Sequence, residues 1–182
     1  MIDRIRIYRQ GIIMTEDKKD RRKGHAVESS IEIDGRYVGL TFSASHFIKN
    51  HPKCGHLHGH NYAVRMRATG QIDETGMVID FFRLEEPMSK ILSSMDHKIL
   101  ISRKYAICQG DSIFFETING SITAPKSSTY MIDIDETTAE QLSSHILSLL
   151  LREIGPDADR IQSMEIELLE SEGRIGSARI SL

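Results

Sequence analysis

The stretch TFSASHFIKNHPKCGHLHGHNY, residues 41–62, decides how the rest of the chain is interpreted. Between residues 46 and 60 it holds five histidines and one cysteine, and two of the histidines form an H-x-H pair, His58 and His60. In a β-strand, residues i and i+2 lie on the same face. An H-x-H pair on a strand therefore directs two imidazoles toward one place.

The residues on both sides of the loop in this stretch alternate between apolar and polar types, which predicts two strands. The apolar parity comprises Val38, Leu40, Phe42, Ala44 and His46 before the loop, and His58, His60, Tyr62, Val64 and Met66 after it. Any one of the three histidines could be an ordinary core or surface residue. Three at matching inward parity favour a metal site, and three neutral nitrogen ligands with a fourth position open are typical of catalytic zinc. His51 and His56 are expected to be exposed in the loop.

Composition and charge limit the class of protein. The chain has 182 residues, 40% of them hydrophobic and 27% charged, as in one globular domain. Its net charge of −3 argues against a nucleic-acid partner bound through phosphate neutralisation. The charged N-terminus does not resemble a signal peptide, and the apolar run HILSLLL is too short to cross a membrane. Two cysteines give no disulfide framework, so we expect a cytoplasmic protein.

The order of the predicted elements indicates an α+β fold with an antiparallel sheet and two helices packed on one face. Four stretches are expected as strands: residues 31–47, as a hairpin that turns at Asp34-Gly35 or as one long strand, then 57–69, 163–171 and 176–182. Two stretches are expected as helices: one after Asp80, which Pro87 kinks or starts afresh, and one from about residue 135 to Gly155-Pro156.

The whole chain, residues 1–182, is expected to form one domain with two additions. Residues 1–30 would be an N-terminal extension, with a short strand at 2–9. Residues from about 100 to 135, which contain Gly110, Gly120 and Pro125, would be an inserted hairpin with loops.

Cys54 and the pair Asp96-His97 are candidates for proton transfer. Cys54 lies four residues before His58, and a thiol beside a dication and imidazoles is favoured as a thiolate. A catalytic thiol is the favoured interpretation; a fourth zinc ligand or a small apolar side chain are the alternatives. Asp96-His97 could cap the preceding helix, or the carboxylate could fix the tautomer of the imidazole in a relay.

Two further carboxylates lie in informative positions. In Thr137-Thr138-Ala139-Glu140 a hydroxyl precedes a carboxylate by three residues, which matches a capping box. Glu170 shares its strand parity with Met164, Ile166 and Leu168, so it should point inward, where an unpaired carboxylate is costly. A ligand edge with two adjacent N–H donors would satisfy it.

The ordered motifs FSASHF, C-x-x-x-H-G-H-N-Y, GMVIDF, MDH, TTAE and Glu170-Ser171 together resemble the 6-pyruvoyl-tetrahydropterin synthase / 6-carboxy-tetrahydropterin synthase family. The resemblance runs from about residue 38 to the C-terminus, apart from the insertion. It implies a tunnelling fold, in which four-stranded sheets of several subunits join into a barrel, with pterin sites between subunits. A homo-oligomer is therefore expected, a hexamer built as a dimer of trimers.

The same resemblance implies a role for each candidate residue. His46, His58 and His60 would hold zinc. Cys54 would be the catalytic thiol, with Asp96 and His97 completing a proton relay. Glu170 would anchor the pterin, helped by Thr138 and Glu140. The sequence departs from the usual Pro-Thr-Ser-Glu of the family at residues 137–140.

The spacing between the cysteine and the H-x-H pair resembles the 6-carboxy branch of the family. That branch converts 7,8-dihydroneopterin triphosphate to 6-carboxy-5,6,7,8-tetrahydropterin, acetaldehyde and triphosphate, in the pathway to queuosine-type deazapurines. A branch that carries glutamate in place of the cysteine is disfavoured by Cys54. Two alternatives remain: a 6-pyruvoyl-tetrahydropterin synthase, and a non-catalytic assembly domain stabilised by zinc. Lys49, Lys53 and Arg65 are candidates for binding the triphosphate by proximity.

Overall fold

A computed structural model describes residues 28–182 of the chain, and all structural statements concern that range. The strand predicted at residues 2–9 and nearly all of the N-terminal extension lie outside the described residues. None of the helices in residues 28–182 is both long and apolar enough to span a membrane.

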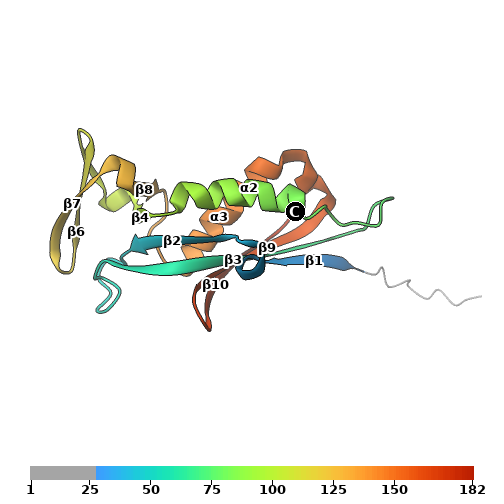
Figure 1. The fold of residues 1–182 in the computed structure, drawn as a ribbon, viewed down its shortest axis with the longest axis horizontal. Helices are drawn as coiled ribbons and strands as arrows, with labels where there is room; N and C mark the ends of the chain where they lie inside the picture. The colour runs from blue at the N-terminus through green and yellow to red at the C-terminus, as the bar shows by residue number, and fades with distance from the viewer. Residues whose placement is uncertain (1–27) are drawn as a thin grey trace, which may run out of the picture.

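A seven-stranded sheet forms the centre of the molecule (Figure 1). Its order is β10 (Arg174–Ser181), β9 (Ile161–Ser171), β3 (His58–Gly70), β2 (Thr41–His46), β4 (Lys98–Ser102) and β8 (Thr129–Ile132), with β1 (Ser29–Asp34) also paired to β3. The pairs among β1, β2, β3, β9 and β10 are antiparallel, as predicted. The pairs β2–β4 and β4–β8 are parallel and add two strands to the expected sheet, and the seventh strand arises because residues 31–47 contain both β1 and β2.

The hairpin considered for residues 31–47 does not form. Instead β1 and β2 both pair with β3, one after the other along its length, and the single helical turn α1 (Gly35–Val38) separates them. Gly35 permits this arrangement, because a Cβ atom there would lie 2.4 Å from the Val64 carbonyl oxygen. Val38 is consequently exposed in α1 rather than inward, so its predicted place on the apolar face of the strand was wrong.

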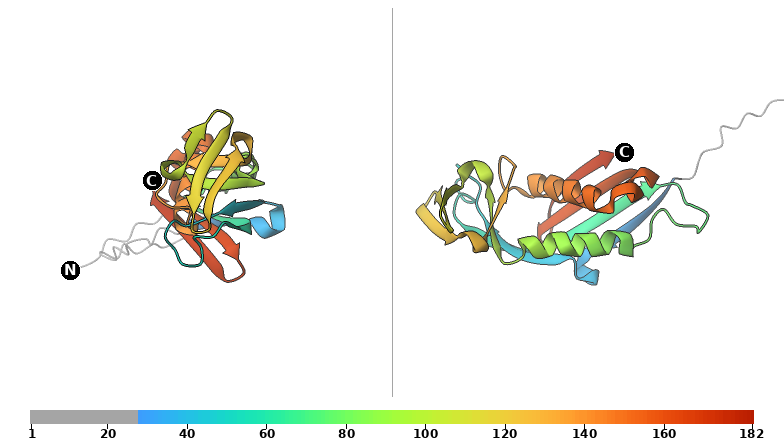
Figure 2. Two further views of the ribbon diagram at one scale, coloured as in Figure 1. Left: turned by 90° about the vertical axis from the view of Figure 1, so that its left-hand side faces the viewer. Right: turned by 90° about the horizontal axis from the view of Figure 1, so that it is seen from above.

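Two long helices, α2 (Phe82–Met95) and α3 (Ala139–Ile154), cover one face of the sheet and leave the other face free (Figures 1 and 2). The main core lies between the helices and the sheet and contains Phe42, Val64 and Met66 at the predicted parity. Helix α2 begins five residues before Pro87 and continues through it, so Pro87 does not start a new helix. The N-cap position is Phe81, and the carboxylate of Asp80 just before it accepts the Phe82 N–H at 2.9 Å. Helix α3 is followed by the 3₁₀ helix η3 (Gly155–Arg160).

Residues 103–128 build a separate unit at one end of the molecule, seen at the left of Figure 1 and in the right panel of Figure 2. Strands β5 (Ile107–Gln109), β6 (Ser112–Thr117) and β7 (Gly120–Pro125) form an antiparallel sheet, which we call the accessory sheet. The 3₁₀ helices η1 (Arg103–Tyr105) and η2 (Lys126–Ser128) connect it to β4 and β8. It has its own core of Phe47, Ile101, Ile113, Phe115 and Ala124.

Candidate metal centre and active site

The three histidines of the opening stretch converge at one end of the central sheet. His46 ends β2, and His58 and His60 begin β3; the register places His46 opposite His58 and Ala44 opposite His60. One ligand nitrogen of each histidine lies within 4.8 Å of those of the other two. Strand periodicity and antiparallel pairing therefore bring together three residues separated by up to fourteen positions in sequence.

The hydrogen bonds of two of these histidines fix which nitrogen is free. His46 Nδ1 lies 2.7 Å from the Thr137 carbonyl oxygen, and His58 Nδ1 lies 2.8 Å from the His56 carbonyl oxygen. Because a carbonyl only accepts, each Nδ1 carries the proton and each Nε2 lone pair remains available. Backbone carbonyls commonly orient metal-binding histidines in this way.

Burial favours the neutral form of two of the three histidines, which is the form that binds a metal. Burial lowers the pKa of His46 to about 4 and lowers the pKa of His60 as well. The Nε2 atoms of His46 and His60 are buried and have no hydrogen-bond partner. Buried polar atoms without partners are costly, and a cation would satisfy both of these. The residues thus fit a divalent metal with nitrogen ligands.

Glu170 lies beside the cluster. Its Oε1 is 3.5 Å from Nε2 of both His46 and His60, and its side chain is 23% exposed. Glu170 lies on the predicted inward side of β9, because Met164, Ile166 and Leu168 at the same parity are buried in the core. Its closeness to the histidines was not evident from the sequence, because it depends on the pairing of β9 with β3.

Cys54 lines a cavity of about 270 Å³ together with His58, His60 and Glu170. The cysteine is half-buried, and the loop around it is held by internal hydrogen bonds. Its carbonyl accepts the Ile48 N–H at 2.7 Å, and its own N–H donates to His51 Nδ1 at 2.8 Å. His51 and His56 have exposed side chains, as expected, but His51 has the additional role of holding this loop.

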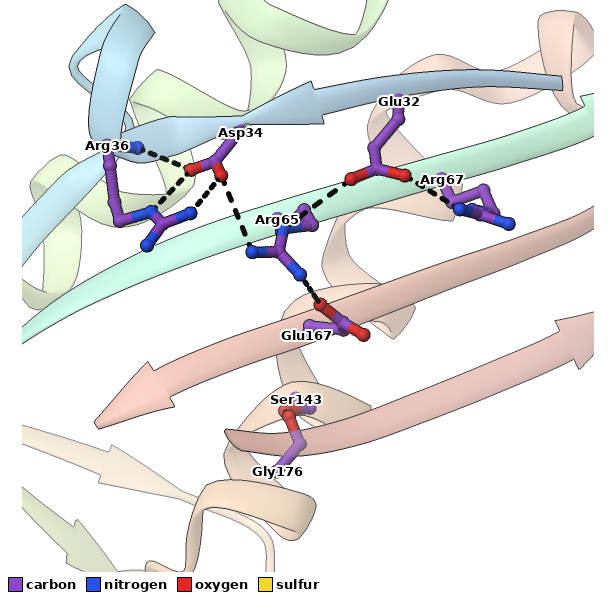
Figure 3. Close-up of polar contacts among 8 residues, drawn as sticks. All are labelled: Glu32, Asp34, Arg36, Arg65, Arg67, Ser143, Glu167 and Gly176. Atoms are coloured by element: carbon purple, nitrogen blue, oxygen red, sulfur yellow. Dashed lines mark hydrogen bonds and ion pairs between the residues drawn. The ribbon is translucent and has the colours of Figure 1, made fainter. Parts of the chain in front are cut away.

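Two cations, Lys53 and Arg174, also line the Cys54 cavity. Of the three triphosphate-binding candidates predicted from the sequence, Lys49, Lys53 and Arg65, only Lys53 lines this cavity. Lys49 donates to the Glu116 carbonyl at 3.3 Å. Arg65 lies on the helix-free face and pairs with Glu167 at 2.6 Å (Figure 3). Arg174 was missed from the sequence; the turn at Glu172-Gly173 returns β10 alongside β9 and places Arg174 opposite Ser171.

Asp96 and His97 form a preorganised pair between α2 and β4. His97 Nδ1 lies 2.8 Å from Asp96 Oδ2, and Asp96 Oδ1 accepts the Ser43 N–H at 2.8 Å. The hydrogen bonds from Ser43 and His97 hold the pKa of Asp96 below its usual value. Asp96 is also the C-cap of α2, so the capping and relay interpretations are compatible.

Asp96 and His97 line a different cavity from the one that Cys54 lines. His97 lines a cavity of about 800 Å³ with Ser43, Asn61 and Arg65, whose strand parity is opposite to that of the core residues. Neither Asp96 nor His97 is among the residues that line the Cys54 cavity. The His97 side chain is 82% exposed. In one chain, the two halves of the expected relay therefore lie in different cavities.

The predicted capping box is displaced by one residue. Thr138, not Thr137, is the N-cap of α3, and its hydroxyl accepts the Gln141 N–H at 3.4 Å. Thr137 is buried and has a different task, because its hydroxyl donates to the Phe47 carbonyl at 2.8 Å while its own carbonyl holds His46. Glu140 is exposed, and neither it nor Thr138 is among the described residues that line the Cys54 cavity.

The fold and the histidine cluster define an α+β protein with a candidate metal centre at one end of its central sheet. The sequence family described as 6-pyruvoyl tetrahydropterin synthase matches residues 37–180. The chain belongs to this family of pterin-converting enzymes, and its fold is the tunnelling fold.

Individual relatives carry both names of the family. A protein of Methanocaldococcus jannaschii called a putative 6-carboxy-5,6,7,8-tetrahydropterin synthase is 27% identical over 139 residues, which is 74% of this chain and 81% of the relative. A protein of Pyrococcus abyssi with the same name is 30% identical over 128 residues, or 69% of this chain and 79% of the relative. The crystal structure of 6-pyruvoyl tetrahydropterin synthase from Plasmodium vivax matches with a TM-score of 0.78 and 25% identity, covering 86% of this chain and 99% of that one.

Proposed function

We propose that this protein is a zinc-dependent lyase that converts 7,8-dihydroneopterin triphosphate and water to 6-carboxy-5,6,7,8-tetrahydropterin, acetaldehyde and triphosphate, in a pathway to queuosine-type deazapurines. The observation that carries the proposal is the cavity that places Cys54 beside the histidine cluster and Glu170. The relatives named 6-carboxy-5,6,7,8-tetrahydropterin synthase support this choice of product.

Zinc held by His46, His58 and His60 would supply a Lewis acid for the oxygens of the substrate side chain. The Cys54 thiolate removes a proton from the side chain, which lies in the same cavity. Glu170 accepts two N–H groups from the pterin edge, a bidentate arrangement that fixes orientation. Lys53 and Arg174 provide positive charge for the triphosphate at the rim of this cavity.

The second proton-transfer group is supplied by another copy of the chain. Asp96 and His97 are paired and exposed but face away from the Cys54 cavity, so a neighbouring subunit would present its own pair to Cys54. This arrangement accounts for an expected homo-oligomer, a hexamer of two trimers. Thr138 and Glu140 at the start of α3 contact the pterin once the subunits assemble.

We also infer a cytoplasmic location, where a free thiol such as Cys54 remains reduced. The partner of the site is the small pterin triphosphate, with no nucleic acid or membrane involved.

The decisive experiment is mass spectrometry of the products after incubation of the zinc-loaded protein with 7,8-dihydroneopterin triphosphate. A 6-carboxy product with acetaldehyde is the expected result. A 6-pyruvoyl product would overturn the choice of branch while keeping the site.

A 6-pyruvoyl-tetrahydropterin synthase is the second candidate, favoured by a Caenorhabditis elegans relative called a putative 6-pyruvoyl tetrahydrobiopterin synthase, 32% identical over 88 residues. A non-catalytic zinc-stabilised assembly domain is the third. It predicts no product at all, together with unfolding when a chelator removes the metal.

A further inference from the structure

The accessory sheet has no part in the proposed chemistry, yet it packs against the loop that carries Cys54. We propose that this sheet is a positioning element for the Cys54 loop, residues 47–57, and that Phe115 and Ile118 are its positioning residues. This inference rests on the proposed function for the tests that measure kcat, but not for those that measure hydrogen exchange.

Both ends of the loop contact the core of the accessory sheet. Phe47, which follows His46 directly, stacks on Phe115 with ring centroids 5.5 Å apart and an interplanar angle of 8°. Leu57, which precedes His58 directly, packs against the same core. Both junctions between the loop and the histidine cluster are thus anchored on residues 101–124.

The middle of the loop is attached to the hairpin turn between β6 and β7. The Ile118 N–H donates to the carbonyl of Gly55, the residue that follows Cys54, at 3.2 Å. Gly55 is buried, and a Cβ atom there would lie 2.6 Å from the His51 carbonyl oxygen and 3.4 Å from Ile118 Cβ. Lys49 Nζ donates to the Glu116 carbonyl at 3.3 Å, which adds a second attachment on the same hairpin.

A third attachment joins the loop to the segment before α3. The Lys49 N–H donates to Glu136 Oε2 at 3.0 Å, and the Tyr105 hydroxyl donates to the other oxygen of the same carboxylate. Tyr105 packs against the core of the accessory sheet. Glu136 precedes Thr137, whose carbonyl orients His46. The accessory sheet therefore contacts the loop and, through Glu136, the segment that holds a metal ligand.

These contacts fix where the Cys54 sulfur lies relative to the histidine cluster. A displacement of about 1 Å in a catalytic group is enough to cost roughly 10²-fold in rate. The core of the accessory sheet is separate from the main core, so weakening one contact on it should leave the metal centre assembled. The predicted signature is a lower kcat at unchanged metal content, with local loosening of residues 48–56.

The first test removes one hydrogen bond. Ile118 is the second residue of the turn Thr117–Gly120, a position at which type I and II turns favour proline, and its φ is not positive. Ile118→Pro therefore removes the N–H donor and places the proline ring against the Gly55 carbonyl. Ile118→Ala is the matched control, because it shortens the side chain and keeps the N–H. We expect Ile118→Pro to lower kcat about tenfold and to speed hydrogen–deuterium exchange in a peptide covering residues 48–56. Ile118→Ala should change both much less.

The second test removes the aromatic stack. Phe115→Ala is compared with Phe114→Ala, a change of the same size on the opposite face of β6. We expect Phe115→Ala to accelerate exchange in the loop more than in a reference peptide from α3, and to lower kcat more than Phe114→Ala does. Metal content, measured by mass spectrometry of the intact protein, should stay at one ion per chain in both variants.

Equal loop exchange in Ile118→Pro and Ile118→Ala would overturn the proposal. So would acceleration spread evenly over the loop and α3, because the accessory sheet would then only add to global stability. Hydrogen exchange does not depend on the substrate. If wild-type protein converts no pterin, the proposed function fails, whereas the exchange comparison still decides the role of the accessory sheet.

Discussion

The two cavities that carry candidate catalytic groups differ in how the histidines beside them are partnered. His60, which lines the Cys54 cavity, and His46, its neighbour in the histidine cluster, each have a buried Nε2 without a hydrogen bond. In the larger cavity on the other face, Asp96, His97 and Ser43 satisfy one another, and the imidazole is open to solvent. The first arrangement fits a metal ion, and the second is the one that the proposed function assigns to contact with another subunit.

The two cavities also differ in the face of the sheet on which they lie. Helices α2 and α3 cover the face of the sheet that carries the histidine cluster. The helix-free face instead carries paired charges, in which Arg65 contacts Asp34 and Glu167 while Arg67 contacts Glu32 (Figure 3). Such pairs contribute little to stability in water, but they neutralise a face that would be covered in an assembly.

The largest effect is expected at Cys54. Cys54→Ala should lower kcat roughly 10²–10⁴-fold with zinc content unchanged, because a proton-transfer group is lost and a ligand is not. Steady-state kinetics with metal analysis of the same sample measures both. Cys108→Ala, in exposed strand β5, is the control and should leave kcat unaltered. Loss of zinc from Cys54→Ala would make the thiol a ligand instead.

The separation of the two cavities predicts complementation between subunits. Cys54→Ala and His97→Asn should each lose roughly 10²–10⁴-fold in turnover when expressed alone. Co-expressed, they should regain a measurable fraction of wild-type turnover, because some sites then combine an intact Cys54 with an intact His97 from another chain. Turnover that stays at the level of the single variants would mean that both groups act within one subunit.

The buried cluster should make the metal-free protein sensitive to acid. The pKa of His46 falls from 6.5 to about 4 on folding, so between these values the unfolded chain binds a proton that the folded chain does not. The free energy of unfolding should therefore decrease by about 3 kcal/mol as the pH falls from 7 to 4. Urea titrations at several pH values measure this.

His46→Asn should remove most of that slope. If the slope persists, another group is responsible, and His60 and His145 are the alternatives because burial also lowers their pKa.

The smallest effects are expected at the two threonines before α3. Thr137→Val removes the hydroxyl that holds Phe47 and should weaken zinc affinity about tenfold, since groups that orient metal ligands have effects of this order. Thr138→Ala removes the N-cap and should lower the free energy of unfolding by about 1 kcal/mol without changing zinc affinity. Competition with a chromogenic chelator and thermal unfolding separate the two. If Thr137→Val lowered the free energy of unfolding and Thr138→Ala weakened zinc affinity instead, the helix cap would be Thr137.

Strand parity explains why much of the site was predictable from the sequence. The alternation that places Phe42 and Val64 in the core also directs His46, His58 and His60 inward, and the same rule places Glu170. These predictions need only local geometry with a period of two residues. The two helices were predictable for a similar reason, since their apolar faces repeat at helical spacing.

The features that were missed depend on contacts between distant segments. Val38 leaves the apolar face because Gly35 packs against Val64, which inserts a helical turn between β1 and β2. The cap of α3 moves to Thr138 because Thr137 is used by Phe47 and His46. Arg174 reaches the cavity only through the pairing of β10 with β9, and no local pattern reports which face of a sheet Asp96-His97 will occupy.

The backbone at His97 restricts how this position can change during evolution. Its φ of 57° lies in the left-handed region, where glycine, asparagine, aspartate and histidine are tolerated best. Selection for stability alone would favour glycine here by about 1 kcal/mol. A sequence that lost its need for the imidazole would thus be drawn to glycine within a few substitutions, and the residue at position 97 can serve as a marker of whether a related chain retains the proposed proton relay.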